Sequence, residues 1–230
     1  MAEQQQISAV LTNLFGYHLL QLEDALPCDL LLDSRIRHRM VMVSRDGVRR
    51  PARGETGQFI GEPDQMPIGN DTIDVVLCPH LLEYAASPHE VLREVERILI
   101  PEGHVVIAGF NPWSVWGLMR LLTGWNKRVP WCGRFYSSMR IRDWLALLGF
   151  DTVFTRTFFF RPPLRHAGLL QRLDFLERAG SRWWPRLGGI YIVVAKKRLT
   201  TLTPIKPRWR PRRSLLQGKL PEATARRDKQ

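Results

Sequence analysis

The stretch that decides the fold is residues 73–109. It opens with Ile73-Asp74-Val75-Val76-Leu77-Cys78 and closes with Val105-Val106-Ile107-Ala108, two nearly continuous apolar runs. Such runs are typical of strands that are covered on both faces of a sheet. Between them, apolar residues recur at the spacing of one helix face: Val91, Leu92, Val95, Ile98 and Leu99. The order strand, helix, strand predicts a right-handed βαβ unit with parallel strands.

The two ends of this helix carry their own signals. Ser87 is predicted as the N-cap, Pro88 occupies the first helical position, and Glu90 closes a capping box. Pro101 and Gly103 are predicted to end the helix.

Elements on both sides continue the alternation of strands and helices. The remaining strands are predicted at 18–22, 39–43, 58–61, 152–160 and 190–195. Helices are predicted at 7–14, 30–36 and 169–179, and a further helix capped by Ser137 or Ser138 is predicted to stop at Gly149. Seven strands with helices between them indicate an α/β fold on a doubly wound sheet.

Composition excludes several classes of protein. Of the 230 residues, 44% are hydrophobic and 24% charged, values typical of a globular protein rather than a fibrous or disordered one. No apolar run approaches the ~18 residues of a transmembrane helix, and the polar N-terminus does not resemble a signal peptide. The three cysteines and the scattered histidines lack disulfide-framework or metal-ligand spacing, so no metal is expected and the expected location is cytoplasmic.

Positive charge is concentrated at the end of the chain. The formal net charge is +12, and residues 196–230 supply +10 of it, with twelve Lys or Arg against Glu222 and Asp228. Because this segment also contains four prolines and few apolar residues, it is predicted to be disordered. We therefore divide the chain into a domain at 1–196 and a basic tail at 197–230. The tail either acts as a solubilising segment or makes electrostatic contact with nucleic acid or an anionic membrane.

Two stretches carry a family resemblance. They are Gln65-Met66-Pro67-Ile68-Gly69-Asn70-Asp71-Thr72-Ile73-Asp74-Val75-Val76-Leu77-Cys78-Pro79-His80-Leu81-Leu82-Glu83-Tyr84 and Leu92-Arg93-Glu94-Val95-Glu96-Arg97-Ile98-Leu99-Ile100-Pro101-Glu102-Gly103. Both resemble the class I S-adenosylmethionine-dependent methyltransferases, most closely the type 11 domain also seen in ubiquinone/menaquinone-biosynthesis methyltransferases. The resemblance spans residues 10–196. It implies a Rossmann-like methyltransferase fold with a doubly wound, mostly parallel seven-stranded sheet and an antiparallel last strand.

The resemblance also implies a cofactor, S-adenosyl-L-methionine. The family's first strand ends in a glycine-rich loop, whereas residues 20–27 of this chain contain no glycine and place Glu23 and Asp24 in the turn. Because glycine lets a ligand approach the main chain most closely, we expect weak cofactor binding. The residues predicted to contact the cofactor are Glu23, Ser44, Glu62, Met66, Cys78 and Pro79.

His80 is the candidate catalytic residue. It follows the strand 73–78 at the carboxyl edge of the sheet, where α/β folds bind ligands. It is a candidate general base or cofactor contact, and the alternative is a loop histidine bonded to backbone. Methyl transfer relies mainly on proximity and orientation, so it needs no obligatory base. The neighbouring Glu83 and Tyr84 are expected to pack and cap locally.

A tryptophan-rich cap is predicted at about 110–136. It contains Trp113, Trp116, Trp125 and Trp131 among apolar residues. In the family this place shapes the acceptor pocket, so Trp113 and Trp116 are the candidate substrate-binding residues for an apolar or aromatic small molecule. Two alternatives are an interfacial amphipathic helix edged by basic residues and a packed cap whose tryptophans belong to a core.

Two functions from different classes follow from these observations. The first is an S-adenosylmethionine-dependent methyltransferase of unknown acceptor, which the resemblance favours. The second is a catalytically inactive relative that keeps the fold as a binding or scaffold protein and makes its contacts through the basic tail and the aromatic cap. The glycine-free turn favours this second function. We adopt the methyltransferase as the working hypothesis.

Overall fold

A computed structural model describes residues 2–23, 30–31, 34–45, 56–123, 130–160, 184 and 187–198. All of them belong to one structural unit, Met1–Leu199. The predictions for the turn at 24–27, the helix at 169–179 and residues 199–230 of the basic tail lie outside the described residues, whereas Lys197 is the last residue of the strand Ile190–Lys197.

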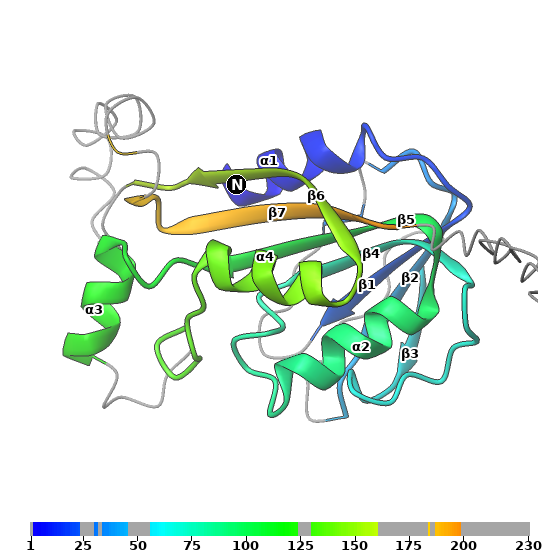
Figure 1. The fold of residues 1–230 in the computed structure, drawn as a ribbon, viewed down its shortest axis with the longest axis horizontal. Helices are drawn as coiled ribbons and strands as arrows, with labels where there is room; N and C mark the ends of the chain where they lie inside the picture. Colours follow the sequence, from blue (N-terminus) through cyan, green and yellow to red (C-terminus); the bar gives the residue numbers. More distant parts are fainter. Residues whose placement is uncertain are drawn as a thin grey trace, which may run out of the picture. The chain divides into compact units, whose positions relative to one another are not determined.

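The described residues form one seven-stranded sheet in the order β3-β2-β1-β4-β5-β7-β6. Every pairing is parallel except those of β7, which runs antiparallel to both β5 and β6. This arrangement (Figure 1) confirms the predicted mostly parallel sheet with an antiparallel last strand. The strands are β1 (His18–Glu23), β2 (His38–Val43), β3 (Gly57–Ile60), β4 (Ile73–Pro79), β5 (Leu99–Phe110), β6 (Phe150–Phe158) and β7 (Ile190–Lys197).

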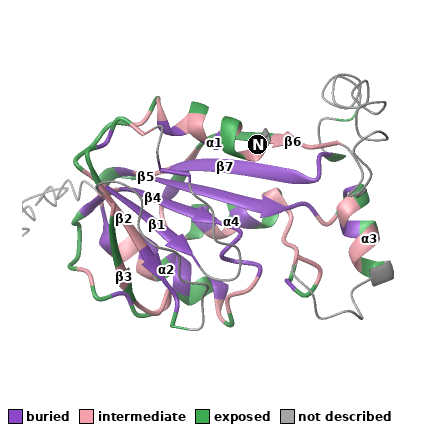
Figure 2. Cartoon of the chain, turned by 180° about the vertical axis from the view of Figure 1, so that it is seen from behind, coloured by how far each residue is buried: buried purple, intermediate pink, exposed green. Residues whose placement is uncertain are grey.

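Helices cover both faces of the sheet. α1 (Ala2–Leu11) packs on one face, where Ile7 and Leu11 join an apolar core with alternate residues of the central strands. α2 (Pro88–Ile98) and α4 (Ser138–Leu147) pack on the other face and form a second core. Figure 2 shows the central strands buried between these layers. α3 (Val115–Thr123) lies beyond the carboxyl end of β5 (Figure 1).

The predicted βαβ unit is confirmed, with corrections at its helix ends. Pro88 begins α2, but the Ser87 side chain makes no capping hydrogen bond, so the predicted capping box is wrong. The Ser87 carbonyl instead accepts from the backbone N–H groups of Glu90 and Val91. α2 also ends before Pro101, because Leu99 is already extended and starts β5.

Two other local predictions have opposite outcomes. The described residues of the predicted helix 30–36 are not helical. Leu30, Leu31 and Ile36 are nevertheless buried in the core on the α1 face, so the apolar spacing reflects packing rather than a helix. At α4, Ser137 is the N-cap and its side chain accepts from the Arg140 N–H. The predicted stop at Gly149 is confirmed by a φ of 84° there.

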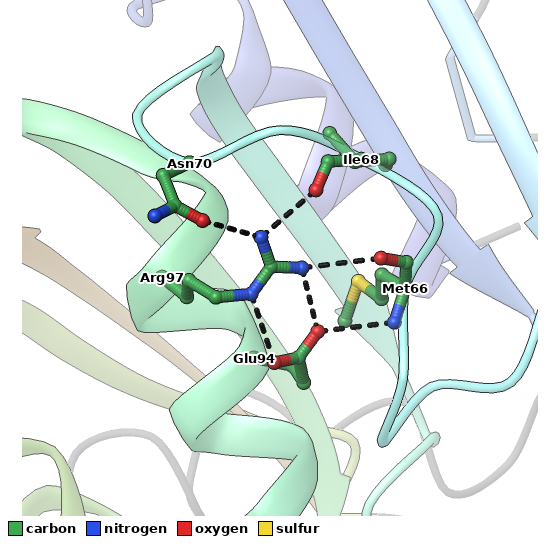
Figure 3. A network of polar contacts seen from close by, with 5 residues as sticks. All are labelled: Met66, Ile68, Asn70, Glu94 and Arg97. Atoms are coloured by element: carbon green, nitrogen blue, oxygen red, sulfur yellow. Dashed lines mark hydrogen bonds and ion pairs between the residues drawn. The ribbon is translucent and has the colours of Figure 1, made fainter.

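A polar network anchors the loop that leads into β4 (Figure 3). The Arg97 guanidinium donates to the carbonyls of Met66 and Ile68 and to the Asn70 side chain. Glu94 accepts from Arg97 on both carboxylate oxygens and from the Met66 N–H at 3.0 Å. Each partner stabilises the other's charge, which lowers the pKa of Glu94 and raises that of Arg97. Glu94 and Arg97 therefore fix where the chain enters β4.

The strand order reverses between β1 and β4. After β3-β2-β1 the sheet continues in the opposite sense with β4 and β5. The carboxyl ends of the strands on either side of such a switch point are where open α/β sheets bind ligands. The same edge carries most of the residues that the sequence singled out.

No helix among the described residues is long and apolar enough to cross a membrane.

Candidate active site at the carboxyl edge of the sheet

Four of the predicted residues lie where strands end at this edge. Glu23 is the last residue of β1, Ser44 follows β2, Pro79 ends β4 and His80 comes directly after it. Glu62 follows β3 after one further residue. The strand pairing therefore brings these residues to the same edge of one sheet.

The ends of β1 and β2 present buried polar side chains. Glu23 and Ser44 are buried, and the Ser44 N–H donates to the Glu23 carbonyl at 3.0 Å. The Glu23 carboxylate accepts from the Gln21 side chain, which is also buried. A buried carboxylate at a ligand-binding edge offers an acceptor for hydroxyl or ammonium groups.

The other predicted cofactor contacts differ in accessibility. Glu62 is partly exposed and pairs with Arg45 at 3.7 Å, so it remains available at the end of β3. The Met66 side chain is instead packed in the core on the α2 face, and its main chain is held by Glu94 and Arg97. Cys78 is fully buried in the same core, and burial raises the pKa of its thiol to about 12. Met66 and Cys78 therefore support the edge rather than line it.

His80 is the most constrained residue of the site. Its side chain is 2% exposed and its φ is 52°, in the left-handed region that non-glycine residues rarely occupy. Its N–H donates to the Ala108 carbonyl at 2.9 Å, and its ring stacks on Phe110 with centroids 4.0 Å apart. Strain of this kind persists where surrounding structure imposes it, and it clusters at functional sites.

Two glutamates from different segments face the His80 ring. Nε2 lies 2.9 Å from an oxygen of Glu3 in α1, and Nδ1 lies 3.5 Å from an oxygen of Glu83. Burial lowers the pKa of His80, but the hydrogen bonds and charges of Glu3 and Glu83 outweigh it and raise that pKa to about 9. The ring is therefore an imidazolium at neutral pH, which can donate a proton or stabilise negative charge but cannot accept a proton.

Glu83 is a site residue that sequence reasoning expected to act only as local packing. It is 4% exposed, one oxygen accepts from the Phe110 N–H at 2.7 Å, and its carbonyl accepts from the Arg134 N–H. Its other oxygen, Oε2, is buried without a hydrogen-bond partner among the described residues. A Cβ at Gly109 would lie 2.8 Å from the Glu83 carboxylate and 2.5 Å from the Tyr191 hydroxyl oxygen, so glycine allows this packing. The position of Glu83, three residues after His80, was the feature of the sequence that could have indicated this role.

An aromatic stack continues from His80 towards α3. Phe110 stacks on Phe135 and Trp116, with centroids 5.0 and 5.8 Å apart. Trp116 also contacts Trp131 and Phe159. Of the two predicted substrate-binding residues, Trp116 therefore belongs to the wall that begins at His80. Trp113 lies in the turn that precedes α3 and is 76% exposed.

Buried Asn111 and Ser114 hold this turn in place. The Asn111 side chain donates to the Gly188 carbonyl at 2.9 Å and accepts from the Trp113 N–H. The Ser114 hydroxyl donates to the Asn111 carbonyl and accepts from the Gly117 N–H. Neither residue was predicted as a site residue from the sequence. Asn and Ser residues soon after a buried strand are typical of turns, and this pattern could have identified them.

Chemically, the edge combines buried acids, one imidazolium and an aromatic wall. The described residues contain no group of three or more His, Cys, Asp or Glu side chains able to hold a metal ion. The arrangement suits a ligand that carries positive charge and hydroxyl groups next to an apolar partner.

Comparisons with known proteins agree with this geometry. A methyltransferase domain model matches residues 33–107. The uncharacterized protein YafS of Escherichia coli is 33% identical over 207 residues, which cover 89% of this chain and 79% of YafS. The demethylmenaquinone methyltransferase of Chlamydia muridarum is 36% identical over 84 residues, which cover 34% of this chain and 35% of that protein.

Solved structures show the same fold at low sequence identity. A putative methyltransferase of Haloferax volcanii, in complex with the Trm112 methyltransferase activator, has a TM-score of 0.61 at 18% identity over 85% of this chain and 88% of its own. An S-adenosylmethionine-dependent methyltransferase of Mesorhizobium loti has a TM-score of 0.60 at 14% identity over 86% of this chain and 98% of its own. With the domain match and the strand order, these findings confirm that the chain belongs to the class I S-adenosylmethionine-dependent methyltransferases.

Proposed function

We propose that the carboxyl edge binds S-adenosylmethionine and that the chain methylates a neutral or cationic small molecule of apolar or aromatic character. The observation that carries the proposal is the cluster of the half-buried Glu3 with the buried His80 and Glu83 at the end of β4. Two carboxylates around one imidazolium leave a net negative charge, which favours a cation and disfavours an anion in a poorly solvated site.

The residues present fit this cofactor. S-adenosylmethionine carries a sulfonium, an ammonium and ribose hydroxyls, and the buried Glu23, Ser44 and unpartnered Glu83 Oε2 are acceptors for such groups. Glu23, Ser44 and the partly exposed Glu62 would hold it at the ends of β1, β2 and β3. When bound, the cofactor would supply an electrophilic methyl group.

His80 then acts through charge and position rather than as a general base. Held as an imidazolium, it orients Glu83 and ties α1 to the end of β4 through Glu3. The wall of Phe110, Trp116 and Trp131 would bind a flat or apolar acceptor and exclude water. Methyl transfer depends mainly on such orientation. The name of the Chlamydia muridarum relative, which denotes a demethylmenaquinone methyltransferase, supports an acceptor of the quinone type.

Calorimetric titration of the full chain with S-adenosylmethionine and S-adenosylhomocysteine tests the proposal. We expect S-adenosylmethionine to bind with a dissociation constant of about tens of micromolar, because the glycine-free turn removes backbone contacts. Glu83→Gln removes one negative charge and should weaken binding of S-adenosylmethionine more than binding of S-adenosylhomocysteine, which lacks the sulfonium charge. Glu90→Gln on the exposed side of α2 is the matched control. Absence of binding, or equal losses for both ligands in Glu83→Gln, would contradict the proposal.

A further inference from the structure

α3 presents an apolar face that no described residue covers. Trp113 is 76% exposed, Leu118 is 58% exposed and Leu121 is 72% exposed. The opposite side of the helix is held by the stacking of Trp116 on Phe110 and Trp131. The packed side therefore holds α3 in place, and the exposed side chains belong to an ordered helix.

The exposed apolar surface extends to a second segment. Trp184 and Leu187, which precede β7, are also exposed. The Asn111 side chain bonds to the Gly188 carbonyl, so the turn before α3 and the start of β7 are neighbours. An exposed tryptophan therefore occurs in each of the two segments. Tryptophan is enriched where a protein surface meets the headgroup region of a bilayer.

The charge of the surrounding sequence indicates what this face meets. Between Glu102 and Asp143 the chain has no acidic residue but six Lys or Arg, two of which, Lys127 and Arg128, come four and five residues after the end of α3. A helix that combines exposed apolar side chains, tryptophan and basic flanks is typical of segments that lie in the interface of an anionic membrane. A nucleic-acid partner would use the positive charge but would not need the large exposed apolar side chains.

We propose that the α3 face, defined by Trp113, Val115, Leu118 and Leu121, docks on the surface of an anionic lipid bilayer. The leucines would enter the acyl boundary while the basic residues contact the headgroups. Docking would bring the aromatic wall next to the membrane, where an apolar acceptor would be concentrated. The proposal concerns surface binding alone and does not depend on methyl transfer or on cofactor binding.

Flotation of the full chain with vesicles tests this proposal. The probe is phosphatidylcholine containing about 30% phosphatidylglycerol, compared with phosphatidylcholine alone. The variant Leu118→Glu/Leu121→Glu should bind the anionic vesicles at least ~10-fold more weakly, because two leucines no longer enter the bilayer. The matched control is Met139→Glu/Leu147→Glu, which changes two exposed apolar residues of α4 and should bind like the unmodified chain.

Three results would overturn the proposal. They are failure of the unmodified chain to bind anionic vesicles, equal binding by the α3 variant, and equal losses in the α4 control. Gel shifts with a double-stranded oligonucleotide provide a further arm. Loss of oligonucleotide binding with vesicle binding intact in the α3 variant would assign the face to nucleic acid instead. If the double variant unfolds, Trp113→Ser is used, and its vesicle binding should fall by at least ~3-fold.

Discussion

A pair of one acidic and one basic residue lies near each end of β4, and the two pairs differ in burial and in hydrogen bonding. Glu94 and Arg97 lie beside the start of β4, are three residues apart, and use their charged groups fully in hydrogen bonds to one loop. His80 and Glu83 lie beyond its end, also three residues apart, but are almost completely buried, and Glu83 Oε2 has no described partner. The first pair is partly exposed and all of its hydrogen-bonding groups have partners, as expected of a structural clamp. The second retains unused bonding capacity, as expected of a binding site.

The largest effect should follow from breaking the clamp. Arg97→Ala removes the hydrogen bonds to Met66, Ile68 and Asn70, and we expect it to lower the free energy of unfolding by about 3 kcal/mol. Urea denaturation measures this. Arg93→Ala, an exposed position on the same helix, should change the stability by less than about 0.5 kcal/mol. Similar losses in both variants would show that the network contributes nothing specific.

The charge of His80 should make stability depend on pH. Its pKa is raised from 6.5 to about 9, so its stabilising contribution is complete below about pH 6.5 and is lost as the pH rises through about 9. We expect the unmodified chain to lose about 3 kcal/mol of stability over this window. Denaturation curves of His80→Gln should show a much smaller change over the same pH range. A parallel decline in the two proteins would mean that His80 is not held as an imidazolium.

A smaller effect is expected at the rim of the site. Glu62→Ala should weaken S-adenosylmethionine binding by at least about tenfold while leaving the fold intact, because Glu62 is a partly exposed acceptor at the end of β3. Asp64→Ala, in the turn that follows Glu62, is the control and should bind normally. Titration calorimetry distinguishes the two, and unchanged affinity in Glu62→Ala would remove this residue from the site.

The smallest effect concerns the boundary between core and site. Cys78 lies two residues before His80, is fully buried, and has a thiol pKa raised to about 12, whereas Cys132 is exposed. We expect iodoacetamide to modify Cys132 rapidly and Cys78 only after unfolding, because the thiolate is the reactive form. Peptide mass spectrometry measures this. Rapid modification of the native chain at Cys78 would place it in an open cleft.

The sequence predicted the scaffold better than the site, for physical reasons. Local periodicity reveals the apolar run at 73–78 and the apolar stripe of α2. The βαβ unit and the sheet that contains it could therefore be predicted from the sequence. The family motif included Glu94 and Arg97 but not their role, because their partners lie about 30 residues away in a loop. The capping box at Ser87 did not form, and the Glu90 N–H that the Ser87 side chain would have capped instead donates to the Ser87 carbonyl.

The site was harder to predict because it joins distant segments. His80 was selected from its place after β4, but its pairing with Glu3, 77 residues earlier in the chain, depends on how α1 packs across the sheet. That pairing helps to keep His80 protonated, so that it is an imidazolium and not a general base. Glu83 was expected to pack locally, since nothing in the sequence shows that its carboxylate meets the N–H of Phe110. Tertiary contacts, rather than residue types, decide both roles.

Hydrogen exchange with and without S-adenosylmethionine tests whether the carboxyl edge is the binding site. We expect slower exchange in peptides that cover 79–84 and 110–114, at the carboxyl edge. We expect no change in peptides that cover 66–70, where the clamp of Glu94 and Arg97 already holds the backbone. Protection confined to the loop at 66–70, or no protection at the carboxyl edge under saturating cofactor, would contradict the assignment of this edge as the binding site.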